Sequence, residues 1–307
     1  MERTNSRKVL LIYNPASGNG LFKSKLDEII KLFQLRGLFV TPVRGDRRDL
    51  IDEIFLHIRD DEFRKVIVAG GDGTINVVVN AMLRAGKNMP LAIFPAGTAN
   101  DFAYYFDIPS KIEDMVSVAC GEHYTSVDLG MVNDKYFVNV AAMGFMVDVS
   151  QKTDPELKNT LGQMAYYLRG AEEITKIHPL TVKLTSDEYT GEEKMYFMVI
   201  MNGRSAGGFK QVGGDSRVDD GLLDVILFRE MNILEFPTLL LSILQGNHVE
   251  NKHVLHFKTK QVRIESDDDF GTDVDGELCP SLPLDVKVLP GKLKVCTWAD
   301  GTEPPRW

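Results

Sequence analysis

The first third of the sequence alternates short apolar runs with segments that repeat apolar residues at helical spacing. The apolar runs are Lys8–Tyr13, Leu38–Val43, Val66–Ala69 and Leu91–Phe94. The segments with helical spacing are Leu21–Leu35, Arg47–Ile58 and Thr74–Arg84. This alternation predicts a parallel sheet with helices on both faces. Ligands bind such sheets at the carboxyl ends of the strands, where polar, glycine-rich loops follow the first, third and fourth apolar runs.

The second half of the sequence changes to many short strands separated by turn residues. The predicted strands are Ser126–Gly130, Tyr136–Ala142, Leu180–Thr185, Met195–Met201, Leu222–Phe228, Val254–Phe257, Gln261–Ser266, Leu284–Leu289 and Lys292–Thr297. Asn133-Asp134-Lys135 is typical of a hairpin turn, and two helices are expected at Pro155–Lys176 and Ile233–Gln245. We therefore predict an α/β domain over residues 1–126 and an antiparallel β sandwich or barrel over residues 127–297.

Composition excludes several classes of protein. The net charge of −9 disfavours nucleic-acid binding that depends on phosphate neutralisation. Three widely spaced cysteines without a CxxC motif indicate a reducing cytoplasm and no disulfide scaffold. The longest apolar stretch, Ile233–Leu244, contains Glu235 and Pro237 and is about half the length that a membrane span needs. We expect a cytoplasmic protein whose contact with a membrane is peripheral.

The most informative motif is Gly70-Gly71-Asp72-Gly73-Thr74, which joins a predicted strand to a predicted helix. Its three glycines allow the backbone to approach a bulky anion closely. The helix that follows offers free N–H groups and a positive dipole end to phosphate. An acidic side chain in such a loop is costly unless a cation lies between it and the phosphate, so Asp72 predicts Mg²⁺. The structural alternative is a turn capped by Thr74.

Two more loops follow predicted strands. The segment 95–101, with the sequence PAGTAND, supplies a second Gly-Thr pair together with an amide and a carboxylate. The segment 14–18, with the sequence NPASG, could contact phosphate or ribose, although its composition is also that of an ordinary turn. A helix cap by Thr98 is the structural alternative for the first segment, but it does not account for Asn100 and Asp101. Neither a Walker A motif nor a GxGxxG fingerprint occurs.

Together GGDGTIN, PAGTANDFA, NPASG and DVDGE resemble the diacylglycerol kinase catalytic-domain family, in order and spacing over nearly the whole chain. GGDGT is shared with NAD kinases and phosphofructokinases, whereas GTAND narrows the resemblance to lipid kinases. The resemblance implies an α/β nucleotide domain followed by a β-sandwich domain, with the active site in the cleft between them. It also implies that the carboxyl-terminal tail, residues 298–307, packs back on the first domain, that ATP and Mg²⁺ are the cofactors, and that the lipid substrate lies at a membrane surface.

The same resemblance implies roles for individual residues. Contacts to ATP are expected from Asn14, Pro15, Ala16, Ser17, Gly18, Thr41, Gly70, Gly71, Asp72, Gly73, Thr74, Gly97, Thr98 and Asn100. Thr41 is expected at the end of the second strand. Asp72 matches an aspartate that helps hold nucleotide-bound Mg²⁺, and Asp101 matches a second acidic residue needed at the site. Glu277 matches the proposed general base, a role that some relatives give to the aspartate matching Asp72.

A further acidic loop, residues 217–222, resembles a structural Mg²⁺ site of the bacterial kinases. There an aspartate side chain, matched by Asp220, joins two backbone carbonyls, matched by those of Arg217 and Leu222. Hard cations take such oxygen ligands and keep several waters. The structural alternative is an Asp-Gly β-turn.

We therefore predict an ATP- and Mg²⁺-dependent lipid kinase, with diacylglycerol as the first candidate substrate and phosphatidic acid as the product. Phosphatidylglycerol, polyprenols and sphingoid bases are alternative lipid acceptors. The GGDGT motif is also compatible with an NAD kinase, and the fold with a non-catalytic nucleotide or lipid sensor. Degenerate sensors usually lose a carboxylate, whereas Asp72, Asp101 and Glu277 are all present. The sequence leaves open whether the chain forms a homodimer.

Overall fold

The computed structural model describes residues 6–144, 147, 178–205, 212–232, 235–278 and 282–298. The predicted helix Pro155–Lys176 and all but the first residue of the predicted tail lie outside these described residues. The chain divides into two compact units. The first comprises Met1–Val127 and Gly291–Trp307, and the second comprises Asp128–Pro290. The first division lies one residue after the boundary expected after residue 126, and the second lies seven residues before the boundary expected after residue 297.

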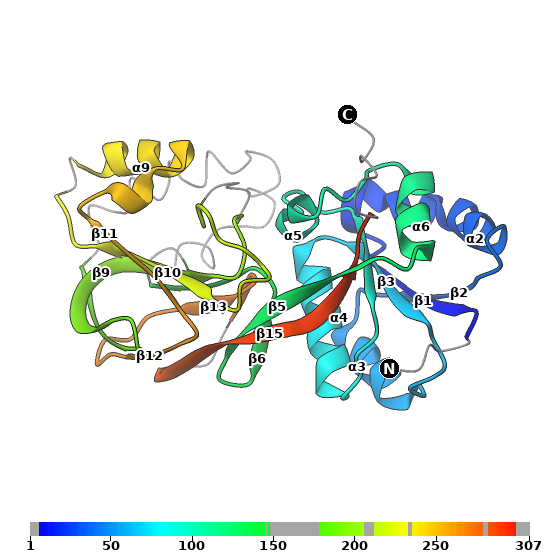
Figure 1. Ribbon diagram of the computed structural model, residues 1–307, viewed down its shortest axis with the longest axis horizontal. Coiled ribbons are helices and arrows are strands. Elements are labelled where there is room, and N and C mark those ends of the chain that lie inside the picture. The colour runs from blue at the N-terminus through cyan, green and yellow to red at the C-terminus, as the bar shows by residue number, and fades with distance from the viewer. Residues whose placement is uncertain are drawn as a thin grey trace. The chain divides into compact units, whose positions relative to one another are not determined.

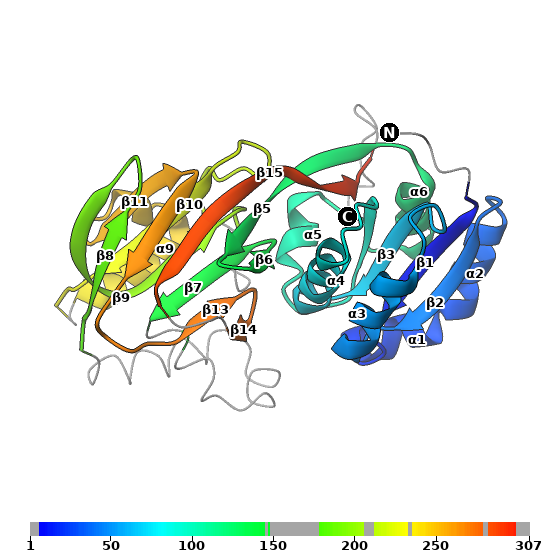
Figure 2. The same cartoon turned by 90° about the horizontal axis from the view of Figure 1, so that it is seen from below.

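The first unit contains a parallel sheet (Figures 1 and 2). Its strands are β1 (Lys8–Tyr13), β2 (Phe39–Arg44), β3 (Lys65–Gly70) and β4 (Leu91–Pro95). Their order is β2-β1-β3-β4, and β4 also pairs in parallel with the last part of β15 (Leu284–Cys296) through Leu91 and Val295. Successive side chains of β1, β3 and β4 are nearly all buried, because helices cover both faces of the sheet, whereas the edge strand β2 is mostly exposed.

Helices follow the strands of this unit in chain order. They are η1 (Ser17–Gly20), α1 (Leu21–Ser24), α2 (Leu26–Gln34), α3 (Arg48–His57), α4 (Asp72–Arg84), α5 (Asp101–Tyr105) and α6 (Ile112–Cys120). Figure 1 shows α2 and α6 on one face of the sheet, and α3 and α4 on the other. The single helix predicted over Leu21–Leu35 is two helices, because the backbone leaves the helical region at Lys25, with φ −105° and ψ 7°.

The strand order positions the loops that the sequence singled out. The chain moves from β1 outward to β2 and then returns to place β3 on the other side of β1. In open α/β sheets ligands bind at such a reversal, beyond the carboxyl ends of the strands. The loops after β1, β3 and β4 all leave the sheet at that edge, because the strands are parallel.

Lys65, at the start of β3, is fully buried, which no pattern in the sequence predicts. Its Nζ donates to the carbonyl oxygens of Ala119, at 2.9 Å, and Gly121, where α6 ends. A cation is favourable at that end of a helix, because the last carbonyls carry a partial negative charge. Burial lowers the pKa of the Lys65 ammonium and raises that of the nearby, fully buried Cys296 thiol to about 11.

The second unit is predominantly antiparallel. Its strands are β5 (Tyr124–Val132), β6 (Lys135–Phe137), β7 (Val140–Gly144), β8 (Leu180–Thr185), β9 (Thr190–Met201), β10 (Leu223–Arg229), β11 (Val254–Thr259), β12 (Gln261–Glu265), β13 (Thr272–Val274), β14 (Glu277–Leu278) and most of β15. Two of these strands, β5 and β15, run through the division between the units. The strands predicted at Leu284–Leu289 and Lys292–Thr297 are one strand, β15.

The strands of this unit enclose one apolar core, and a second cluster lies under α9 (Phe236–Gln245). The long strand β9 links the strands on its two sides, because it pairs with β8 and β7 along one edge and with β10 along the other. Leu239 of α9 packs over Ile226 and Phe228 of β10. A short 3-10 helix, η4 (His248–Glu250), follows α9. Among the helices within the described ranges, none is both long and apolar enough to cross a membrane.

Gly130 of β5 lies opposite Phe137 of β6, across the predicted hairpin turn at Asn133 and Asp134. A Cβ atom at Gly130 would lie 1.9 Å from Cζ of Phe137, whose ring is fully buried in the core. We expect Gly130→Ala to lower the free energy of unfolding by about 1–3 kcal/mol, as overpacking does. Urea unfolding measures the change. In a Phe137→Leu background the same substitution should cost less than half as much, and an equal cost would contradict this explanation.

Candidate functional site

Two glycine-rich loops of the first unit touch through their backbones. A Cβ atom at Gly97, after β4, would lie 2.7 Å from the Cα of Gly71, after β3. A Cβ at Gly71 would lie 3.0 Å from the Cα of Gly97. No side chain fits at either position without moving the other loop. The motifs GGDGT and GTAND are therefore one continuous surface, which explains why each needs its central glycine.

Asp72 links the same two loops through its side chain. Helix α4 begins at Asp72, two residues earlier than expected, with Gly71 as its N-cap residue. The Asp72 carboxylate accepts hydrogen bonds from the backbone N–H groups of Asp101, at 3.2 Å, and Phe102, at 3.1 Å. These groups belong to the first turn of α5, whose N–H groups have no partner within the helix. Asp72 therefore caps α5 from the neighbouring loop, where a negative charge is favourable.

Asn100 folds the loop after β4. Its backbone is left-handed, with φ 51°, and it is the N-cap residue of α5. Its Oδ1 accepts the Gly97 N–H at 2.7 Å, and its Nδ2 donates to the Gly97 carbonyl at 2.8 Å. Because both polar groups of the amide are used inside the loop, Asn100 shapes the backbone of the loop after β4. Asp101, the next residue, is buried.

The loop after β1 joins this arrangement at Ala96. Asn14 donates its backbone N–H to the Ala69 carbonyl at 2.9 Å, and its Oδ1 accepts the Ala16 N–H at 3.0 Å. Gly18 has φ +57°, and a Cβ there would lie 3.2 Å from the Ala96 carbonyl oxygen. The structure thus brings together the predicted residues of all three loops.

Thr41 does not lie at the end of the second strand, where the family resemblance leads us to expect it. Strand β2 continues to Arg44, so that Thr41 is the third residue of the strand, paired with Leu10. Its side chain is exposed. The loop that leaves the carboxyl end of β2 starts after Arg44, where the Gly45 N–H donates to the Tyr13 carbonyl at 2.7 Å. The expected contact of Thr41 with ATP remains a prediction.

The first turn of α4 is a candidate anion site. Thr74 and Ile75 donate their N–H groups to the Gly71 carbonyl, at 2.9 and 3.1 Å. Gly73 is exposed, and a Cβ there would have no neighbour within 4 Å. A phosphate can approach this backbone without meeting a side chain, and the positive end of the helix dipole favours it.

In the second unit the segment DVDGE forms a two-residue turn between β13 and β14. Asp275 and Gly276 have φ +49° and +90°, and Val274 pairs with Glu277. Two positive φ values in a two-residue hairpin are typical of a type I′ turn, for which Asp-Gly is a strong sequence signal. Glu277 is thus the first residue after a tight turn, and its side chain is partly exposed.

Asp275 fixes this turn to the rest of the unit. Its Oδ2 accepts the Val138 N–H at 2.7 Å, and its Oδ1 accepts those of Asn139, at 3.1 Å, and Val140, at 2.9 Å. Sequence reasoning missed this role, because an aspartate in an acidic segment resembles a solvated turn. The Asp-Gly turn signal was the clue that one of these carboxylates could be structural.

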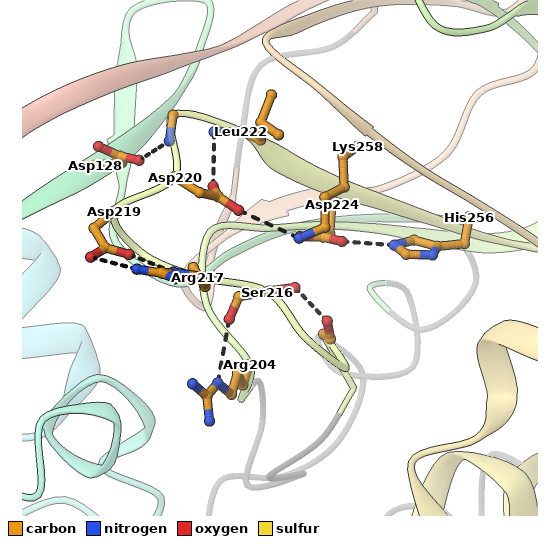
Figure 3. Close-up of polar contacts among 12 residues, drawn as sticks. Asp128, Arg204, Ser216, Arg217, Asp219, Asp220, Leu222, Asp224, His256 and Lys258 are labelled. Atoms are coloured by element: carbon orange, nitrogen blue, oxygen red, sulfur yellow. Dashed lines mark hydrogen bonds and ion pairs between the residues drawn. The ribbon is translucent and has the colours of Figure 1, made fainter.

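The acidic loop before β10 is built around Asp220 (Figure 3). The Asp220 carboxylate accepts the Leu222 N–H at 3.0 Å and lies 3.4 Å from Nζ of Lys258. Arg217 instead pairs its guanidinium with Asp219, at 3.0 Å. One carboxylate and two backbone carbonyls, the donors that the resemblance implies, are of the kind that a hard, hydrated cation takes, and the Asp220 side chain is 21% exposed. Within the described residues, no group of three His, Cys, Asp or Glu side chains could hold a metal ion.

Comparisons with known proteins agree with this geometry. Residues 8–132 match the family model described as diacylglycerol kinase catalytic domain, and residues 139–297 match the YegS C-terminal NAD kinase beta sandwich-like domain. The diacylglycerol kinase of Bacillus subtilis strain 168 is 32% identical, over 90% of this chain and 92% of that protein. That of Staphylococcus aureus strain JH9 is 33% identical, over 90% and 88%.

A solved structure has the same architecture. A crystal structure described as a diacylglycerol kinase from Bacillus anthracis strain Sterne superposes with a TM-score of 0.79 at 26% identity, covering 95% of this chain and 97% of that chain. The predicted fold, an α/β unit followed by a β-sandwich-like unit, is thereby confirmed.

The contact between Gly71 and Gly97 can be tested by adding one methyl group. Gly97→Ala should lower the free energy of unfolding by about 1–3 kcal/mol, because the new Cβ meets backbone that cannot rotate away. Gly73→Ala is the matched control, since its Cβ enters open space, and it should leave stability unchanged or raise it by up to about 1 kcal/mol, because alanine favours the helix more than glycine does. Thermal and urea unfolding would measure both variants. Equal effects would show that the loops do not touch as described.

The anchoring role of Asp275 gives a separate prediction. Asp275→Asn keeps the shape but turns an amide N–H₂ toward backbone donors, so we expect a loss of about 2–3 kcal/mol in the free energy of unfolding. Asp267→Asn, at an exposed position of the same acidic segment, should change it by about 0.5 kcal/mol or less. If both variants unfold at the same urea concentration, Asp275 does not hold the turn.

Proposed function

Because the chain belongs to the diacylglycerol kinase family and is a lipid kinase, we propose that it transfers the γ-phosphoryl group of Mg²⁺-bound ATP to the hydroxyl of diacylglycerol, giving phosphatidic acid. The observation that carries the proposal is the contact of Gly71 with Gly97 beside the first turn of α4. This contact leaves a stretch of backbone without side chains, with Asp72 beside it. Such a surface suits the phosphates of a nucleotide and the cation bound to them. The names of the relatives support diacylglycerol as the acceptor.

The nucleotide phosphates would lie against the first turn of α4. The exposed backbone at Gly73 approaches them, and the helix dipole stabilises their charge. Asp72 would hold Mg²⁺, since carboxylate oxygen is a ligand that this ion prefers. When bound, Mg²⁺ neutralises charge on the transferred phosphoryl group. Asp72 also holds α5 in place, so it fixes the loop that carries Thr98 and Asp101.

The acceptor hydroxyl needs a group that takes its proton. We assign that role to Glu277, whose carboxylate accepts the proton as the bond from the lipid oxygen to phosphorus forms and the bond from phosphorus to the ADP oxygen breaks. General-base help of this kind is worth roughly 10²–10⁴-fold in rate. The tight turn at Asp275 and Gly276 supports the assignment, because it fixes the backbone next to Glu277. The lipid would be met at a membrane surface by peripheral contact.

The proposal is tested with γ-labelled ATP, Mg²⁺ and mixed micelles that contain diacylglycerol, phosphatidylglycerol, a polyprenol or a sphingoid base. We expect label in phosphatidic acid. Glu277→Gln should lower kcat by about 10²–10⁴-fold, with the KM for ATP changed less than about threefold, because the base acts on the acceptor. Glu188→Gln, at an exposed position of the same unit, is the control and should retain full activity.

Two results would count against this mechanism. Label in a different lipid, with none in phosphatidic acid, would replace the proposed substrate while leaving the kinase activity intact. A Glu277→Gln variant that transfers phosphate at the rate of the Glu188→Gln control would remove Glu277 as the base, and the same measurement on Asp72→Asn would then decide whether Asp72 takes that role.

A further inference from the structure

Lys258 bridges two carboxylates at the acidic loop (Figure 3). Its Nζ lies 3.4 Å from Oδ2 of Asp220 and 3.6 Å from Oδ2 of Asp224. The two carboxylates differ in exposure. The Asp220 side chain lies in the loop and is 21% exposed, whereas the Asp224 side chain lies on β10 and is 2% exposed. The Lys258 ammonium therefore pairs with both an accessible carboxylate and a buried one.

Asp224 has a second partner. Its Oδ1 lies 2.7 Å from Nε2 of His256, which is two residues from Lys258 on β11. The register of the two strands places Asp224 opposite Lys258 and Ile226 opposite His256. A buried carboxylate needs such partners, because an unpaired charge is very costly away from water. The buried Asp224 carboxylate thus needs the Lys258 ammonium as a counter-ion more than the accessible Asp220 carboxylate does.

The buried residue Asp128 holds the loop of residues 217–222 in shape. The Asp128 N–H donates to the Val218 carbonyl at 2.6 Å, and its Oδ2 accepts the Gly221 N–H at 2.6 Å. The backbone on both sides of Asp219 and Asp220 is therefore fixed without help from Lys258. A change at Lys258 should alter the charge that Asp220 meets more than the shape of the loop.

We propose that Lys258 is a built-in competitor of the divalent cation at Asp220, and that Asp224 sets the strength of this competition by holding the ammonium when the cation binds. Asp220 meets either the ammonium or the cation, since two positive charges on one carboxylate repel each other. When the cation arrives, Lys258 keeps Asp224 as its partner, so its charge is not left without a counter-ion. The inference rests on the expected cation-binding role of Asp220, and it does not depend on which lipid accepts phosphate.

The prediction has opposite signs for the two residues. Lys258→Met removes the competitor and should tighten Mg²⁺ binding about three- to tenfold, the range expected for a partly exposed ion pair. Asp224→Asn leaves Asp220 as the carboxylate that holds Lys258, so Mg²⁺ should bind about threefold more weakly. In a Lys258→Met background, Asp224→Asn should change the affinity by less than about twofold, because the effect passes through Lys258.

The experiment is calorimetric titration of MgCl₂ into nucleotide-free, chelator-treated protein, with the rise of Tm with Mg²⁺ concentration as a second readout. Lys260→Met is the matched control, because it removes an equal charge from an exposed position two residues away, and its affinity should equal that of the unaltered protein. Asp220→Asn should abolish the binding event. Circular dichroism confirms that each variant is folded.

Several outcomes would overturn the inference. Binding unchanged in Asp220→Asn would mean that no cation site exists there, while the labelled-ATP assay would still report separately on the kinase. Lys258→Met that binds Mg²⁺ no more tightly than Lys260→Met would show that Lys258 does not compete. If Lys258→Met does not fold, Asp224→Asn decides alone, and unchanged or tighter binding in that variant contradicts the proposal.

Discussion

The close approach of Gly71 to Gly97 is the constraint around which the first unit is arranged. Two loops that follow neighbouring strands can share one surface only if neither carries a side chain at the point of contact. Asp72 then extends the contact into a hydrogen-bonded bridge, since its carboxylate caps α5 from the start of α4. The backbone at Gly73, in the first turn of α4, has open space beside it, which suits a bulky anion.

The second unit uses buried or partly buried carboxylates for the same purpose. The Asp275 carboxylate accepts hydrogen bonds from three backbone N–H groups. The Asp128 carboxylate accepts one, and the backbone N–H of Asp128 donates another. Hydrogen bonds to a charged acceptor are stronger than neutral ones, so one side chain can fix a segment that has little regular structure. Asp275 lies in the same acidic segment as the candidate functional residue Glu277, whereas Asp128, which holds the loop of Asp220, comes from the distant strand β5.

Much of the fold follows from local patterns. Strands β1 and β8 have the predicted bounds, because β1 is a short apolar run and β8 alternates Leu180, Val182 and Leu184 with polar residues. The hairpin at Asn133 is also as expected. The start of α4 was placed two residues late, because Asp72 and Gly73 have low helix propensity and are helical only where Gly71 and α5 support them. The two-residue strand β14 is too short to show any alternation.

The candidate site divides in the same way. Sequence identified the three loops after β1, β3 and β4, since glycine, amide and carboxylate residues at strand ends are unusual enough to be noticed. The pattern placed the second strand correctly to within one residue, but the resemblance put Thr41 at its end, whereas Thr41 is the third residue of β2. The sequence could not show that the Asn100 side chain hydrogen-bonds within its own loop, because this contact depends on the left-handed backbone of Asn100.

The sequence by itself determined the class of the two units, the motifs and the family, because these depend on period, composition and short segments that are read locally. Tertiary structure decided which charged residues are buried and what they meet. Lys65 is buried because α6 ends beside it, and Lys258 lies between two carboxylates because β11 pairs with β10 in one register. Such contacts join residues that are far apart in the chain, and no local pattern encodes them.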